Sequence, residues 1–216
     1  MSTTNSSKQT ASAEMFFDPL CPWAWMTSRW LMEVEKVRDI EVTWSVMSLS
    51  VLNEGRDGLS EGYRKLLDRG WGPVRVITAA ARDHGDKVKK PLYDAIGTRL
   101  HPGQRGDTPE DLRQVIVESL DEVGLPGELI DYADNVPGDE IDVALRESHD
   151  RGIGLVGEDV GTPVISIGDV AFFGPVVTPA PKGEAAGKLW DGCLLVAGTP
   201  GFYEIKRTRV KGPDFS

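Results

Sequence analysis

The order of the apolar patterns along this chain restricts its fold more than any other feature. Near the start, Glu14–Phe17 and Ile40–Val46 are predicted as strands, and a helix that begins at Cys21-Pro22 lies between them. A strand, a helix and a strand of these lengths form a βαβ unit, which implies parallel pairing of the two strands. From Val51 to Gly152, by contrast, no segment has a convincing strand pattern.

Strands return in the last third of the chain. Val164–Ile167 and Val170–Phe173 flank Gly168-Asp169, a two-residue turn signal that predicts a β-hairpin. A final helix is expected from about Gly183 to Ala197. The order is therefore β-α-β, helical block, β-β-α. Because helices cannot extend a sheet, the helical block should lie beside it as a cap.

We expect an α/β protein of 216 residues with three parts. Residues 13–50 and 155–209 would form a discontinuous domain, residues 51–154 an all-helical insertion subdomain, and residues 1–12, rich in Ser and Thr, a disordered tail. Within the insertion, a helix that begins at Ser60 is predicted to break at Gly70-Trp71-Gly72-Pro73. The segment Asp139–Arg151 predicts another helix.

Composition excludes several classes of function. The formal net charge of −10 argues against nucleic-acid binding as the main activity. No apolar run approaches the ~20 residues of a membrane span. The first residues lack the apolar region of a secretory signal, so we expect a cytoplasmic protein.

Cys21 and Cys193 have neither a metal-type spacing nor a disulfide framework, and no metal is expected. His84 and His149 lie in polar helical contexts and are expected to face solvent.

Cys21 is the main candidate for chemistry. It directly follows a predicted strand end and begins a helix, where exposed N–H groups and the helix dipole stabilise an anion. We therefore expect an acidic thiol, with a pKa below the ordinary value of ~8.5, whose thiolate is the nucleophile at neutral pH. The alternative is a buried and inert cysteine.

The loop Gly161-Thr162-Pro163, directly before the third strand, is the second candidate. The element order of this chain is that of the thioredoxin fold, in which the corresponding loop faces the nucleophile and holds a cis proline. The backbone of Thr162 would then be able to pair with a substrate. The Thr-Pro pair alone is a weak signal, but it gains weight beside Cys21-Pro22.

Several longer stretches resemble one family. Cys21-Pro22-Trp23-Ala24 with Gly161-Thr162-Pro163 is similar to the DsbA-like branch of the thioredoxin superfamily. Across nearly all of residues 13–209, the chain resembles the actinobacterial mycothiol-dependent reductases. The resemblance rests on the runs Phe17–Trp23, Trp71–Val76, Val156–Pro163, Ala171–Pro175 and Lys206–Arg209.

The resemblance implies a thioredoxin fold with a helical subdomain, no tightly bound cofactor, and mycothiol as the thiol cosubstrate. It places Asn53 and His101 near Cys21, where they would bind cosubstrate or help proton transfer, with ordinary loop roles as the alternative. Trp23 would either stack on a ligand or pack against the cap. The remaining residues of the predicted cosubstrate site are Pro22, Thr162 and Pro163.

One position departs from the family. Such reductases commonly carry a second cysteine where this chain has Ala24, and that cysteine would release the substrate from the first. Cys193 is expected on the apolar face of the last helix, so it is no evident substitute. The site is then either monothiol or an engineered trap, and the sequence is compatible with both.

Three hypotheses of function remain. The leading one is a cytoplasmic thiol–disulfide oxidoreductase in which Cys21 forms a mixed disulfide with a small thiol that an external thiol resolves. The second is an enzyme like the kappa-class glutathione transferases or 2-hydroxychromene-2-carboxylate isomerases, and the third is a non-catalytic DsbA-like domain. The expected partners are a low-molecular-weight thiol and an oxidised or electrophilic small substrate, with neither nucleic acid nor membrane. A homodimer is compatible with the sequence.

Overall fold

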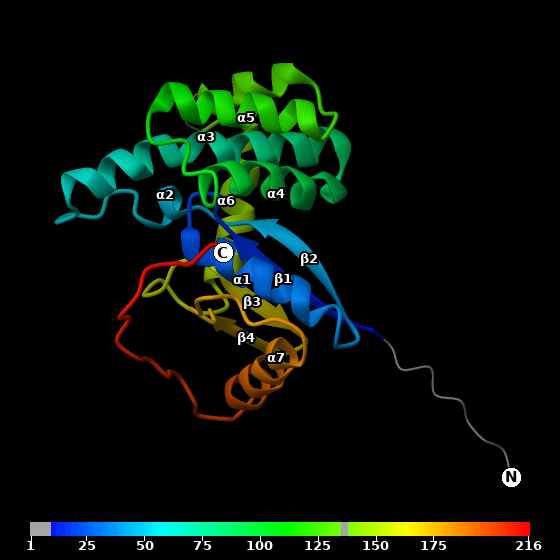
Figure 1. Cartoon of the computed structure of the whole chain (residues 1–216). Helices are drawn as coiled ribbons and strands as arrows, with labels where there is room; N and C mark the ends of the chain where they lie inside the picture. Colours follow the sequence, from blue (N-terminus) through cyan, green and yellow to red (C-terminus); the bar gives the residue numbers. More distant parts are fainter. Residues whose placement is uncertain (1–9, 135–137) are drawn as a thin grey trace, which may run out of the picture.

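The computed structural model describes residues 10–134 and 138–216. Its strands and helices follow the expected order, with the helical block between the second and third strands (Figure 1). The elements are β1 (Ala11–Phe17), α1 (Pro22–Val34), β2 (Ile40–Val46), α2 (Leu49–Leu52), α3 (Glu61–His84), the 3₁₀ helix η1 (Asp86–Val88), α4 (Lys89–Leu100), α5 (Pro109–Glu122), the 3₁₀ helix η2 (Gly127–Asp134), α6 (Glu140–Ile153), β3 (Val164–Ile167), β4 (Val170–Phe173) and α7 (Glu184–Ala197).

The four strands form one sheet in the order β2-β1-β3-β4. β1 and β2 are parallel, and Phe17 lies opposite Val46. β3 is antiparallel to both β1 and β4, and Ile167 pairs with Val170 across the predicted hairpin turn. This arrangement confirms the βαβ unit, the hairpin and the thioredoxin fold with its helical insertion.

The sheet is covered on both faces. α1 and α7 share one face, where the Trp30 and Trp190 rings lie 5.9 Å apart and Trp30 Nε1 donates to the carbonyl of Ala186. The C-terminal end of α6 lies on the opposite face. There a Cβ on Gly152 would sit only 2.6 Å from the Phe16 ring, so glycine permits this close approach.

The helix α3 is continuous from Glu61 to His84, so the predicted break at Gly70–Pro73 is wrong. Pro73 lacks an N–H for the helix ladder, which favours a break locally. Tertiary packing opposes that preference. A Cβ on Gly70 would lie 2.5 Å from Ser50 Oγ of α2, and that hydroxyl donates to the Leu67 carbonyl. Gly70 therefore lets α3 pack closely against α2, and burial of the following turns of α3 stabilises the helix.

The N-terminal boundary also differs from the prediction. β1 begins at Ala11, which pairs with Ile40, so Ala11 and Ser12 belong to the sheet rather than to a tail. Of the remaining residues of the predicted tail, Thr10 is exposed and precedes the strand, and residues 1–9 lie outside the described residues. Within the described ranges, no helix combines the length and apolar character needed to cross a bilayer.

Candidate active site

Cys21 is the N-cap residue of α1, with extended backbone angles that let its side chain turn back over the first turn. Its sulfur accepts a hydrogen bond from the Ala24 N–H at 3.4 Å, and Pro22 occupies the first helical position, where a missing N–H has no cost. Only 5% of Cys21 is exposed. Cys21 therefore lies at the start of the helix as expected, but its thiol is much more enclosed than its position in the sequence suggests.

The Thr162-Pro163 loop faces Cys21 across the end of the sheet. The peptide bond is cis, and the Cys21 thiol donates to the Thr162 carbonyl at 3.3 Å. Both predictions about this loop are confirmed. The Thr162 hydroxyl is buried and has no hydrogen-bond partner within the described residues. One polar group thus stays available beside the sulfur.

Asp18 is a buried carboxylate that sequence reasoning missed. It is 1% exposed, and its two oxygens accept the backbone N–H groups of Leu20, at 2.8 Å, and Leu49, at 2.7 Å. Burial raises its pKa to about 6, against these two hydrogen bonds. Asp18 therefore ties the Cys21 loop to the start of α2. The available signal was its place between the end of β1 and Pro19.

The environment of the thiol contradicts the predicted acidic cysteine. Burial raises the pKa of Cys21, and the negative charge of Asp18 acts in the same direction. The Thr162 side chain and the Ala24 N–H lower that pKa but do not compensate for the lost water. In this closed arrangement, the helix N-terminus is outweighed by desolvation, and Cys21 is a neutral thiol at pH 7.

We expect the titration of Cys21 to reveal this burial. Thiolate absorbance near ~240 nm should rise only at or above the ordinary cysteine value of ~8.5, because ionisation must occur without solvent. Cys21→Ser serves as the blank and retains the signal of Cys193. A midpoint in the acidic range, near the values of ~3.5–7.5 that activated cysteines show, would contradict the closed arrangement.

His101 packs beneath the Cys21 loop. Its Nε2 lies 3.0 Å from the Pro19 carbonyl, and its ring lies 5.5 Å from that of Trp25 and 5.6 Å from that of Phe215. Burial lowers the pKa of His101 to about 4, so the ring is neutral at pH 7 and its Nε2–H donates to Pro19. These contacts favour a positioning role over proton transfer by an imidazolium.

Asn53 ends α2 and is 8% exposed. Its amide nitrogen donates to the Leu49 carbonyl at 2.8 Å and lies 3.4 Å from the Tyr63 hydroxyl. Burial raises the pKa of Tyr63, and the charges of Asp18 and Cys21 add to that shift. Tyr63 is therefore electrostatically close to Cys21, although no motif in the sequence indicated it.

Trp23 is half-buried, and the guanidinium of Arg209 lies 5.3 Å from its ring centre.

Two predictions about residues away from the Cys21 loop change. His149 is 3% exposed rather than solvent-facing, and its Nδ1 accepts the Ser48 N–H at 3.3 Å. Cys193, whose place on the apolar face of the last helix predicts burial, is only half-buried, and both cysteines are free thiols. His84 is exposed as expected.

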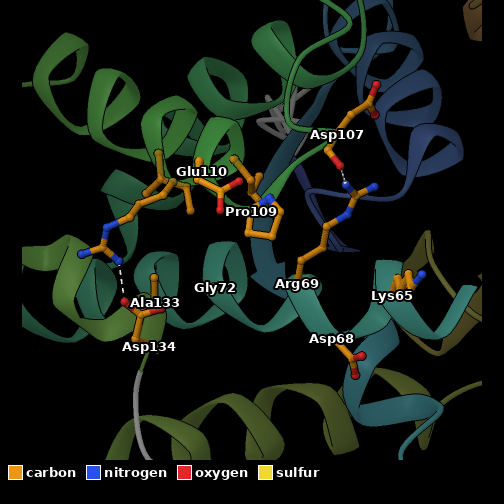
Figure 2. Close-up of a pocket in the computed structure, with 12 residues that line it drawn as sticks. Lys65, Asp68, Arg69, Gly72, Asp107, Pro109, Glu110, Ala133 and Asp134 are labelled. Carbon is orange, nitrogen blue, oxygen red and sulfur yellow. Dashed lines mark hydrogen bonds and ion pairs between the residues drawn. The ribbon is translucent and has the colours of Figure 1, made fainter. Parts of the chain in front are cut away.

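A separate cleft of about 680 Å³ lies among α3, α5 and η2 (Figure 2). Its two arginines are bonded within the protein: Arg113 binds Asp134 at 2.5 Å, and Arg69 donates to the Asp107 carbonyl. Cys21 and the other predicted site residues do not line it. The residues that line this cleft include no cysteine, histidine or serine.

Comparison with known proteins identifies the family of this chain. Residues 20–207 match the Rv2466c-like family, described as mycothiol-dependent nitroreductase Rv2466c. The uncharacterized protein Rv2286c of Mycobacterium tuberculosis (strain ATCC 25618 / H37Rv) is 31% identical over 199 residues, which cover 92% of this chain and 82% of that protein.

Solved structures show the same fold at low identity. A probable DsbA oxidoreductase from Streptomyces coelicolor has a TM-score of 0.55 at 15% identity, covering 95% of this chain and 94% of that chain. The cytosolic disulfide reductase DsbM from Pseudomonas aeruginosa, in a structure with GSH, has a TM-score of 0.53 at 16% identity, covering 85% and 99%. On the evidence of the family match over residues 20–207, this chain belongs to the Rv2466c-like family of mycothiol-dependent nitroreductases, within the DsbA-like thioredoxin fold.

Proposed function

We propose that this protein is a thiol–disulfide oxidoreductase in which Cys21 is the only nucleophile and mycothiol is the thiol cosubstrate. The observation that carries the proposal is the contact of Cys21 Sγ with both the Ala24 N–H and the Thr162 carbonyl. The family match supports mycothiol as the cosubstrate. A reducing cytoplasm would keep such a thiol available.

The reaction begins with loss of the thiol proton. When solvent or a ligand enters the site, the proton that Cys21 donates to Thr162 can leave, and the Ala24 N–H then stabilises the thiolate. The thiolate attacks one sulfur of a mycothiol mixed disulfide. The new disulfide joins Cys21 to mycothiol, the old S–S bond breaks, and the departing thiolate takes up a proton.

Release requires a second thiol. A mycothiol thiolate attacks the mycothiol-borne sulfur, and Cys21 leaves as thiolate while mycothiol disulfide forms. Ala24 offers no internal thiol. Cys193 lies on α7, one helical turn beyond Trp190, and Trp190 packs against Trp30 of α1. Trp30 is nine positions after Cys21, which places it about 13 Å from Cys21 along α1 at 1.5 Å per residue. Since disulfides need Cα atoms within ~7 Å, this placement supports an external resolving thiol.

The cosubstrate site is proposed around Cys21, Trp23 and Thr162. The free hydroxyl of Thr162 suits a polar group of the thiol, and half-buried Trp23 suits stacking. The Asn53 amide and the His101 ring are hydrogen-bonded to backbone carbonyls of the protein, so we assign both residues to positioning of the site. Pro22 and Pro163 would shape the backbone on the two sides of Cys21.

We also propose that residues 13–50 and 155–209 form one domain and that residues 51–154 form the inserted helical subdomain.

The test is to load Cys21 with an isotopically labelled mycothiol, remove excess reagent, and follow release by intact mass. We expect a stable adduct, whose release rate rises in proportion to added thiol because the exchange is bimolecular. The Ala24→Cys variant should release the label without added thiol, since a tethered group has a high effective concentration. Ala24→Ser is the matched control and should behave as the wild type.

Two outcomes would overturn the proposal. Prompt release from the wild type, accompanied by a Cys21–Cys193 disulfide, would make Cys193 the resolving group. Failure to form any adduct with a disulfide, but formation of a thioether between mycothiol and an organic electrophile, would favour the transferase hypothesis instead.

A further inference from the structure

The C-terminal segment is the feature that the proposed chemistry does not use. We define the strap as residues 203–216, which follow α7 and have neither helix nor strand. In Figure 1 the strap, in red, runs back from α7 and ends beside the start of α1. Its apolar side chains Tyr203 and Val210 are 94% and 89% exposed, whereas Phe215 is half-buried and packs against the core. Only part of the strap is therefore seated on the protein.

The seated part reaches Trp23, two positions after Cys21, directly, and it reaches Pro19, two positions before Cys21, only through His101. On one side, the ring of Phe215 lies 5.6 Å from that of His101, which in turn is bonded to the Pro19 carbonyl. On the other side, the Arg209 guanidinium lies 5.3 Å from the Trp23 ring. Pro19 and Trp23 are the residues two positions before and two after Cys21. The strap thus brackets the nucleophile.

A third contact extends the strap toward the substrate loop. The Asp214 N–H donates to the Thr178 hydroxyl at 2.8 Å, and Thr178 lies in the segment after β4. β4 pairs with β3, which begins directly after Pro163. The Gly174 N–H, directly after β4, donates to the Pro163 carbonyl at 2.9 Å, so the strap links a segment that is bonded to this loop with His101 on the cap side of the site. A substrate segment that pairs with the Thr162 backbone would approach across this link.

We propose that the strap determines the size of the disulfide that Cys21 accepts. The proposal rests on the function proposed above. A small disulfide needs space only at the sulfur and at Trp23, which a local shift of Arg209 provides. A protein disulfide must bring its backbone to Thr162, and it is excluded while Phe215 and Asp214 are seated. The strap therefore restricts the enzyme to low-molecular-weight disulfides.

The test compares two substrates in the full-length chain. The double variant Arg209→Ala with Phe215→Ala removes the two side-chain contacts, and Tyr203→Ala, which changes an exposed strap residue, is the matched control. The rate with a small aromatic disulfide, 5,5′-dithiobis(2-nitrobenzoic acid), is compared with the rate of mixed-disulfide formation with insulin. Cys193→Ser is introduced throughout so that Cys21 alone reports.

We expect the double variant to raise the insulin rate by ~10-fold or more and the small-disulfide rate by less than ~3-fold, since the rate follows the fraction of molecules open to each substrate. The Tyr203→Ala control should keep the wild-type ratio. An unchanged ratio of the two rates in the double variant, or an equal rise of both, would overturn the proposal.

A second measurement separates failure of the strap proposal from failure of the proposed function. Alkylation of Cys21 by iodoacetamide is compared with alkylation by a maleimide on a protein-sized polyethylene glycol chain. We expect the double variant to accelerate the large reagent selectively, whether or not Cys21 exchanges disulfides. If no disulfide reacts with any variant but this selectivity holds, the function is wrong and the strap still covers Cys21. If the selectivity is absent, the strap proposal is wrong.

Discussion

A Cys21→Ser variant is expected to form no mixed disulfide with any thiol reagent at the candidate site. A serine hydroxyl is not ionised at neutral pH and cannot form an S–S bond, so exchange should fall to the uncatalysed rate. The fold should be retained, because a serine is a good N-cap residue and can accept the Ala24 N–H as the sulfur does. Intact mass after incubation with mycothiol disulfide, together with the exchange rate, measures the effect.

Cys193→Ser is the matched control for this experiment. Burial raises the pKa of the Cys193 thiol, and no other described group perturbs it, so its removal should leave the exchange rate within about 2-fold of the wild type. If both variants lose activity equally, the two cysteines act together and the one-cysteine mechanism fails. An adduct that persists in Cys21→Ser would transfer the chemistry to Cys193.

The second large effect concerns the ion pair between α3 and α6. Arg75 Nε and Nη2 donate to the two carboxylate oxygens of Asp142 at 2.6 and 2.9 Å, and the two residues are 6% and 0% exposed. Asp142→Ala would leave the Arg75 charge buried without its partner. We expect a loss of about 3–5 kcal/mol in the free energy of unfolding. For a chain of this size, that corresponds to a fall in Tm of roughly 6–20 °C.

An exposed pair provides the control. Arg146 binds both oxygens of Glu54 at 2.7 and 3.1 Å, but the Glu54 side chain is 53% exposed. Glu54→Ala should therefore cost less than about 1 kcal/mol. Urea unfolding measures both variants. Equal effects would show that burial of Arg75 does not dominate the energetics of this pair.

The Asp142 effect should also depend on pH. Burial opposes ionisation of Asp142, but the hydrogen bonds from Arg75 and the Gly138 N–H hold its pKa below the ordinary value. A carboxylate with a depressed pKa contributes stability above its unfolded pKa and loses that contribution as the pH falls through its folded pKa. The difference in unfolding free energy between wild type and Asp142→Ala should therefore shrink in strong acid. A difference that grows in acid would contradict the ion-pair explanation.

The Arg75–Asp142 pair includes a residue of Trp71–Val76, one of the runs on which the resemblance to the family rests. Trp71 in Trp71–Val76 stacks on the Arg75 guanidinium at 4.7 Å and lies 5.4 Å from that of Arg146. Gly72 packs against Ala133 of η2, where a Cβ would be in ordinary contact at 3.5 Å. This run therefore joins the helices of the insertion, and the structure gives it no direct contact with Cys21.

Local patterns determined much of the fold. The alternation in Ile40–Val46 and the glycine turn between β3 and β4 have the same structural meaning in almost any context, because period and turn geometry are properties of a few adjacent residues. The same holds for Cys21 at the start of α1 and for Pro22 after it. These signals placed the sheet, the crossover and the nucleophile at the end of a strand.

Tertiary structure decided the rest, because it depends on contacts between residues far apart in the chain. Pro73 favours a break, yet the packing of Gly70 on Ser50 keeps α3 continuous. The helix N-terminus favours an acidic Cys21, yet burial near Asp18 raises the pKa of the thiol. Local sequence determines the dipole and the hydrogen-bond donors around the sulfur. Only the folded chain, which brings Asp18 and the distant Thr162 to the sulfur, determines how much water reaches it.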